Sequence, residues 1–193
     1  MFRRNYSSAL LEEAVEKLQK GEQPETEERP APLINLHAEA YIDGGYIDDA
    51  MHKIEIYQRI AAIRTNQEVR ELLDELIDRF GEPTKPVMRL LSIARIKNYA
   101  RDLWLKSVSE QPQALDFSLC EGHKLPVQAL VRLDKVFGRR MQALGGKGYR
   151  FTLGAKEKEN ITNCATYILM IMAGDEEALE KAGLHGEQQK EAV

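Results

Sequence analysis

The chain has 193 residues, of which 43% are hydrophobic and 30% charged, a composition typical of one soluble globular domain rather than a disordered or membrane protein. It is too short for a helicase motor, and no segment approaches the roughly 20 apolar residues that span a bilayer, so we expect a cytoplasmic location. The formal net charge of −4 argues against tight, sequence-independent nucleic-acid binding, which depends on clustered lysine and arginine.

The first 32 residues predict a helix followed by a linker. Tyr6–Lys20 is amphipathic, with Leu10 and Leu18 on its apolar side, and it begins so close to residue 1 that we expect a piece of a longer protein. Gly21–Pro32 contains three prolines and four glutamates without an apolar period, so it should be an extended linker.

An alternating segment, Leu33–Ile42, predicts a half-buried strand, because every second residue is apolar. A turn at residues 44–45 follows. Asp48 or Asp49 then caps a helix that should run through Ile63.

Two further helices have clear start and stop signals. Thr65 and Glu68 have the spacing of a capping box, and Gly81 should end the helix that they begin. The third helix spans roughly Lys85–Leu103, with Pro86 in its first turn. The apolar face expected for the Thr65 helix consists of Val69, Leu72, Leu73, Leu76, Ile77 and Phe80.

Beyond Leu103 the pattern changes to shorter elements, and Trp104, the single tryptophan, is expected in the core. In order, we expect strands at Trp104–Ser109 and Leu115–Leu119 joined by a turn at 110–112, a helix at Pro126–Phe137, a strand at Tyr149–Leu153, an apolar helix from Asn160 through Met172, a short helix at Asp175–Lys181, and a frayed tail at 184–193.

These elements predict an α+β fold in which a helical half packs on a small mixed β-sheet, as a single domain with an N-terminal helix and linker. The Leu33, Trp104, Leu115 and Tyr149 strands should form the sheet, and the apolar helix from Asn160 should cover its other end. The order of the strands does not follow from the sequence.

No motif points to catalysis, a metal site or a cofactor. The two cysteines, Cys120 and Cys164, lack CxxC spacing. Residues 145–148 (GGKG) lack the GxxxxGK[ST] register and precede a strand, so a tight turn is favoured over a phosphate loop. Four histidines are scattered over different elements without metal-ligand spacing: His37, His52, His123 and His185.

One long stretch resembles a known family. Residues 46–103, including ELIDRFG at 75–81, resemble the C-terminal domain of bacterial transcription-repair coupling factors. INLHAEAYIDGGYI at 34–47 is similar to that domain's first strand and entry turn, and YSSALLEEAV at 6–15 to the helix that closes the upstream translocase module. The resemblance implies that residues 1–20 close that module, 21–32 form an acidic linker, and 33–183 form a regulatory domain cut from a larger ATP-driven DNA translocase.

The resemblance implies a role without chemistry. In that family the C-terminal domain packs against the UvrB-like N-terminal module of the same chain. It hides the UvrA-binding surface of that module until the motor engages a stalled RNA polymerase. We therefore expect an autoinhibitory domain with no catalytic residue, no metal and no cofactor, and with an intramolecular partner.

The helix that follows Thr65 offers a docking surface. Its acidic residues recur at i, i+3, i+4 and i+7, which places them on one stripe opposite the apolar face. A solvated surface and a partner-docking site both fit this pattern, and the family context puts the two interpretations on an equal footing. The predicted docking residues are Glu71, Asp74, Glu75, Asp78 and the bordering Arg79.

The alternative is a nucleic-acid-binding accessory domain. On the third helix the basic residues do not share one stripe, which favours ordinary solvent-facing charge. Salt-sensitive binding of duplex DNA would support this alternative. The residues that could form such a patch are Arg89, Arg95, Lys97, Arg101, Arg132, Lys135, Arg139, Arg140 and Lys147.

Overall fold

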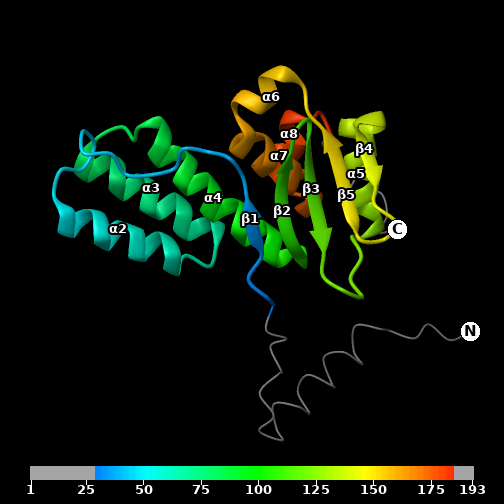
Figure 1. The fold of residues 1–193 in the computed structure, drawn as a ribbon, viewed down its shortest axis with the longest axis horizontal. Coiled ribbons are helices and arrows are strands. Elements are labelled where there is room, and N and C mark those ends of the chain that lie inside the picture. The colour runs from blue at the N-terminus through cyan, green and yellow to red at the C-terminus, as the bar shows by residue number, and fades with distance from the viewer. Residues whose placement is uncertain (1–28, 185–193) are drawn as a thin grey trace, which may run out of the picture.

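The computed structural model describes residues 29–184, so the expected helix at 1–20, residues 21–28 of the linker and residues 185–193 of the tail lie outside the described residues. Within them the chain folds as one α+β domain, which confirms the predicted fold class. A five-stranded sheet forms one side of the molecule, and two helices, α2 (Ala50–Ala62) and α3 (Asn66–Phe80), form the other (Figure 1).

The helical subdomain contains α2 (Ala50–Ala62), α3 (Asn66–Phe80) and the amino-terminal half of α4 (Lys85–Asp102). Asp49 caps α2, because its carboxylate accepts a hydrogen bond from the His52 N–H at 2.8 Å. Each helix begins and ends within two residues of its predicted limits. Local signals therefore set these boundaries, as the cap residues had indicated.

The start of α3 differs slightly from a capping box. The Thr65 hydroxyl accepts from the Glu68 N–H at 3.2 Å, as expected. The Glu68 carboxylate, however, accepts from the N–H of Arg64 at 2.8 Å, one residue before the cap. Gly81 ends the helix at φ 80°, a left-handed value that glycine adopts without strain.

The sheet has the order β1-β2-β3-β5-β4. β1 pairs parallel with β2, and the remaining pairs are antiparallel, so the sheet is mixed as predicted. β4 was not predicted, because three residues are too few to show an alternating pattern. The strands are β1 (Leu33–Asn35), β2 (Leu105–Gln111), β3 (Ala114–Leu119), β4 (Met141–Ala143) and β5 (Gly148–Thr152).

The first strand is shorter than predicted. Only Leu33–Asn35 pairs with the sheet, whereas the alternation continues through Ile42. The segment from residue 36 leaves the sheet edge and runs over α4 towards α2 (Figure 1). Ile34 therefore packs against the sheet core, while Ile42 is buried in the helical subdomain. Alternation predicted which side chains point inward, but the neighbouring strand decides where pairing ends.

The predicted position of the hairpin turn between β2 and β3 was also wrong. Gln111 still pairs with Ala114, so the two-residue turn is Pro112–Gln113 rather than residues 110–112. Proline has no N–H to donate to a ladder, and here it stands in the turn itself. The tight turn predicted at residues 145–148 occupies residues 144–147, between β4 and β5, with the Lys147 N–H donating to Leu144 O at 3.0 Å.

Helices cover one face of the sheet. The carboxyl-terminal half of α4, together with α5 (Val127–Phe137) and α7 (Ile161–Ala173), packs there around Phe117 and Phe151. In Figure 1 these helices lie behind the strands. The short elements are η1 (Gly138–Arg140), α6 (Ala155–Glu159), which was not predicted, and α8 (Glu176–Lys181).

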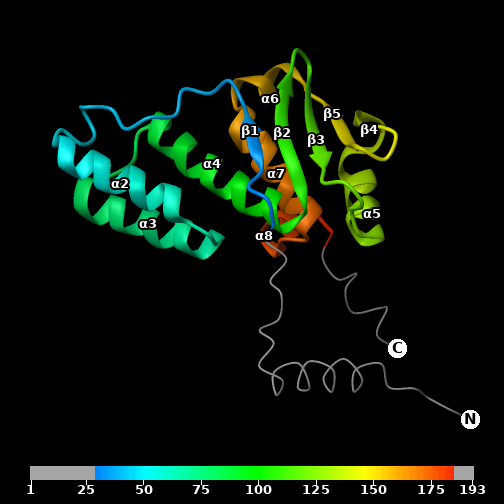
Figure 2. The ribbon, with the colours of Figure 1, turned by 60° about the horizontal axis from the view of Figure 1, so that its bottom comes forward.

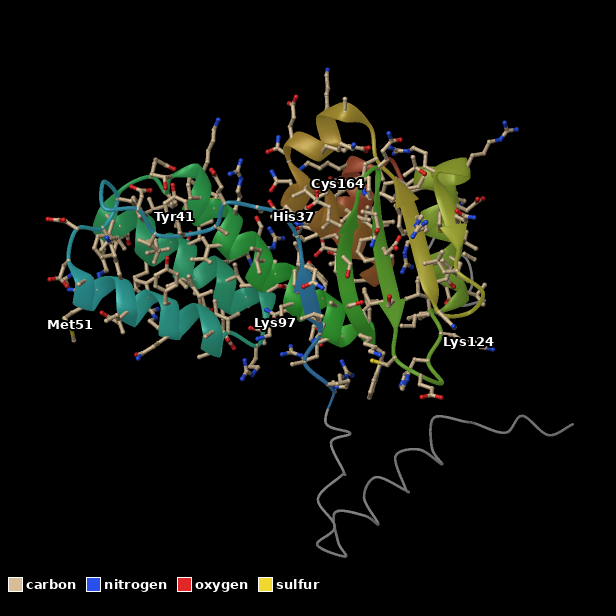
Figure 3. The ribbon with its side chains drawn as sticks, in the orientation of Figure 1. His37, Tyr41, Met51, Lys97, Lys124 and Cys164 are labelled. Carbon is tan, nitrogen blue, oxygen red and sulfur yellow. The ribbon has the colours of Figure 1, made fainter. Side chains whose placement is uncertain are left out.

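Two separate hydrophobic clusters stabilise the molecule, and α4 belongs to both. Val87, Leu91 and Ala94 are buried with α2 and α3, while Ile96 and Ala100 are buried beneath the sheet. The helical half thus contacts the sheet mainly through α4, and both views show α2 and α3 beside its amino-terminal half (Figures 1 and 2). Figure 3 labels Met51 in the helical subdomain and Lys124 on the opposite side of the molecule.

Candidate protein-interaction site

The predicted docking residues lie on the outer surface of α3. Glu71, Asp74 and Asp78 are exposed, whereas Val69, Leu72 and Leu76 on the opposite side of the helix are buried. The helix is therefore amphipathic in the predicted sense, with its acidic residues towards solvent, except that Ile77, expected on the apolar face, is exposed.

Glu75 has a partner within the domain. Arg59, on α2, donates to both Glu75 carboxylate oxygens at 2.5 Å, and Arg79 donates to one of them at 2.8 Å. These hydrogen bonds, that from Arg59 foremost, lower the pKa of Glu75 from 4.5 to about 2. Glu75 thus joins α2 to α3, and Arg59 is a residue that the α3 pattern could not reveal.

Arg79 links the same two helices. Besides Glu75, it faces Glu55 on α2, with 3.8 Å between Arg79 Nη1 and Glu55 Oε1. Its guanidinium also lies over the Phe80 ring, 4.9 Å from the ring centroid. About a third of the Arg79 side chain stays exposed, so it can contact solvent while it is paired.

The rest of the stripe is available to a partner. Glu71 accepts a hydrogen bond from its helix neighbour Gln67 at 3.0 Å. Within residues 29–184, Asp74 and Asp78 have neither a hydrogen bond nor an ion pair. The structure therefore separates the five predicted residues into a paired set, Glu75 and Arg79, and a solvent-facing set, Glu71, Asp74 and Asp78.

The chemically reactive side chains are dispersed. In the described part of the chain, no three His, Cys, Asp or Glu residues lie close enough together to hold a metal ion. Burial raises the pKa of the Cys164 thiol to about 12, which suppresses its nucleophilicity at neutral pH. His37 lies beside Glu110, with 3.2 Å between Nδ1 and Oε2, and His123 stacks on Trp104.

Several of the basic residues considered for nucleic-acid binding are bonded within the protein. Arg132 donates to the backbone oxygens of Ile171 and Met172 at 2.9 and 2.8 Å, at the end of α7. Arg140 pairs with Glu157 at 2.8 Å. Guanidinium groups bonded in this way are poorly placed to neutralise phosphates.

The described residues thus form an α+β domain with a charged helix surface and dispersed reactive groups. It resembles the crystal structure of the C-terminal domain of a transcription-repair coupling factor, with a TM-score of 0.61 and 26% identity over 79% of this chain and 93% of that one. Residues 36–130 match the TRCF domain family. The chain belongs to the family of TRCF domains.

Full-length relatives agree with this assignment. The transcription-repair-coupling factor of Bacillus subtilis is 33% identical over 153 residues, and that of Staphylococcus haemolyticus is 32% identical over 145. These matches cover 78% and 74% of this chain but only 13% and 12% of the relatives. The chain therefore corresponds to the TRCF domain and not to the motor of a coupling factor.

No helix between residues 29 and 184 is both long enough and apolar enough to cross a bilayer.

Proposed function

We propose that this domain acts by docking, without catalysis, against the UvrB-like N-terminal module of a coupling factor. In the docked state it masks the UvrA-binding surface, and engagement of RNA polymerase by the motor releases it. The observation that carries the proposal is the acidic stripe of α3, which the helical subdomain presents to solvent.

The paired residues support the stripe. By joining α2 and α3, the contacts of Glu75 with Arg59 and Arg79 hold the helix surface in one orientation. Preorganisation of this kind reduces the cost of ordering a binding surface. Glu71, Asp74, Glu75, Asp78 and Arg79 thus form one docking surface, in which three residues face the partner module and two keep the surface rigid while still contacting it.

A tether makes a weak contact sufficient. Two surfaces of one chain meet at a high effective concentration, so a few exposed ion pairs can keep the closed state populated. The same contact opens when the motor supplies a modest difference in binding free energy between the two states. This explains why a regulatory surface can be small and polar.

The test uses a full-length coupling factor that carries this domain. Asp74→Lys together with Asp78→Lys should increase UvrA binding about three- to tenfold, because two exposed ion pairs are lost. Among the described residues neither Asp74 nor Asp78 forms a hydrogen bond or ion pair, so the ion pairs that join α2 and α3 stay intact. Isothermal titration would measure the affinity.

Glu121→Lys is the matched control, because Glu121 is exposed and lies after β3, in the other half of the domain. It should leave UvrA binding unchanged. Equal UvrA affinity in the unaltered protein and the Asp74/Asp78 variant would reject the stripe as the docking site.

A further inference from the structure

Two neighbouring cavities follow the line along which α4 meets α7. The larger, about 430 Å³, includes Lys85 and Arg89 of α4 and Asn160 at the start of α7. The smaller, about 230 Å³, includes Arg95 of α4. Asn163 lines both, so the cavities adjoin along one seam, which we call the basic groove.

The two helices run in the same direction. Their amino-terminal ends share the larger cavity, and at the other end the Tyr99 hydroxyl donates to Asp175, just beyond α7, at 2.6 Å. Figures 1 and 2 both show α7 beside α4. The basic groove therefore extends along α4 from its first turn towards its carboxyl-terminal half.

The groove has an excess of positive charge. Its walls contain the carboxylates Glu159 and Glu177, and the latter lies 3.8 Å from Lys181 on α8. Cations outnumber these two carboxylates. The cations are Lys85, Arg89, Arg95 and Lys181.

Three of the cations have no acidic partner. Within residues 29–184, neither Lys85, Arg89 nor Arg95 forms an ion pair. Arg89 donates to the backbone oxygen of Glu39 at 3.4 Å, and Arg95 contacts the sulfur of Met170 at 3.8 Å and the hydroxyl of Tyr99, none of which is an acidic group of the groove. Arg89 and Arg95, which the helix pattern had not placed on one stripe, thus line the same groove.

Arg95 also has an unsatisfied donor. Its Nε is buried and has no hydrogen-bond partner in the described structure. A buried N–H of a charged group is costly to leave unbonded, so native proteins nearly always supply an acceptor. The groove is therefore suited to a ligand with carboxylate oxygens.

We propose that the acidic segment of this same chain, residues 22–28, docks in the basic groove. This segment contains four glutamates within seven residues, Glu22, Glu25, Glu27 and Glu28. It ends at Arg29, which is held at the carboxyl-terminal end of α4. There Arg29 pairs with Asp102 at 3.2 Å and lies over the Trp104 ring, 5.4 Å from the centroid.

The segment is long enough. Arg95 lies seven residues before Asp102, about 10 Å along the helix axis, and Arg89 lies about 20 Å from it. Seven extended residues reach about 23 Å. Starting at Arg29, the chain can thus return along α4 and place glutamates opposite both arginines.

Docking of residues 22–28 would shorten the undocked part of the linker. It would so keep the domain close to the residues that precede the linker. Masking of a partner surface does not depend on it, because residues 22–28 and the groove belong to one chain. The proposal therefore stands or falls separately from the proposed function.

Backbone ¹⁵N relaxation of the full 193-residue chain tests this contact. At low ionic strength, the order parameters of the four glutamate amides should be about 0.8, as in ordered backbone. Arg89→Gln with Arg95→Gln should lower them below about 0.6, and so should an ionic strength near 1 M. Lys97→Gln is the matched control, because Lys97 lines neither cavity of the groove, and it should change nothing.

A second variant, changed in residues 22–28 and not in the groove, tests the contact even if the Arg89/Arg95 variant misfolds. Changing all four glutamates to glutamine alters no residue of the described range and should shift the Arg95 Nε–H resonance. Order parameters already below about 0.6 in the unaltered chain would overturn the proposal. The proposal would also be overturned if a short DNA duplex bound in the basic groove equally well in the unaltered chain and in the variant without the four glutamates. The groove would then bind nucleic acid.

Discussion

Trp104 shows how a single residue departs from what its type suggests. It was expected in the core, yet it is only partly buried and adopts φ 54°, the one positive value among non-glycine residues in the described structure. Its indole stacks on His123 with 4.1 Å between ring centroids, and Arg29 covers it as well. Through these two ring contacts, Trp104 connects Arg29, which precedes β1, with the loop after β3.

This backbone geometry gives an unusual order of substitution effects. Both Trp104→Gly and Trp104→Val remove the ring, but glycine adopts a positive φ freely while β-branched valine does so at a cost. We expect the valine variant to be less stable than the glycine variant by about 1–2 kcal/mol. Urea unfolding followed by circular dichroism measures the difference, and equal stabilities would contradict a strained position.

Glu75 makes stability depend on pH. Its folded-state pKa of about 2 lies below the ordinary 4.5, so between these values the unfolded state binds more protons. The stabilisation is complete above pH 4.5 and is lost as the pH falls towards 2. Because the side chain is one-third exposed, solvent screening limits the effect to about 1 kcal/mol or less.

In the Glu75→Gln variant, the free energy of unfolding should therefore decrease less steeply as the pH falls from 5 to 2. Urea titrations at a series of pH values would show it. Glu71→Gln, on the same helix but bonded only to Gln67, is the control and should keep the original slope. An unchanged slope in the Glu75 variant would mean that its ion pairs do not persist in solution.

At the scale of elements, α7 depends on a side chain from another helix. The last carbonyl groups of a helix lack intrahelical donors, and Arg132 of α5 supplies two of them. Gly174 follows at φ 78°, and a Cβ there would lie 3.2 Å from the Arg132 guanidinium. Burial lowers the pKa of Arg132, but the guanidinium stays charged at any ordinary pH.

Arg132→Met should lower the unfolding free energy by about 1–3 kcal/mol, because Met172 O loses its Arg132 donor and Ile171 O keeps the Gly174 N–H at 3.3 Å but loses Arg132. Methionine keeps the aliphatic packing, so the loss reports the hydrogen bonds. Arg139→Met, at an exposed position of η1, serves as the comparison and should change little. Equal effects of the two substitutions would contradict a capping role.

At the scale of the molecule, one helix belongs to two hydrophobic clusters. α4 contributes Leu91 to the cluster of α2 and α3, and Ile96 to the cluster beneath the sheet. If either cluster opened alone, half of α4 would lose its packing while the other half kept it. Shared packing of this kind favours cooperative unfolding.

Leu72→Ala is expected to cost about 2–5 kcal/mol, because Leu72 is buried among α2, α3 and α4. The transition seen by Trp104 fluorescence, in the other half, should shift as much as that seen by helical circular dichroism. Leu33→Ala, at an exposed site, should move neither. Separate midpoints for the two probes would show that the halves unfold independently.

The sequence by itself determined the fold class, the three central helices and the exposed acidic stripe. These follow from short-range relationships, such as Thr65 beside Glu68, Gly81 after Phe80, and the period of Leu72 and Leu76. Cap hydrogen bonds and helical periodicity involve residues within four positions of each other, so a linear pattern contains them.

Only the tertiary structure decided where β1 stops pairing, that Glu75 meets Arg59 sixteen positions away, and that Trp104 contacts both Arg29 and His123. It also divided the core into two clusters and brought Arg89 and Arg95 to one groove. Each of these depends on which surface packs against which. That choice is made by the summed burial of many distant side chains, and no local pattern encodes it.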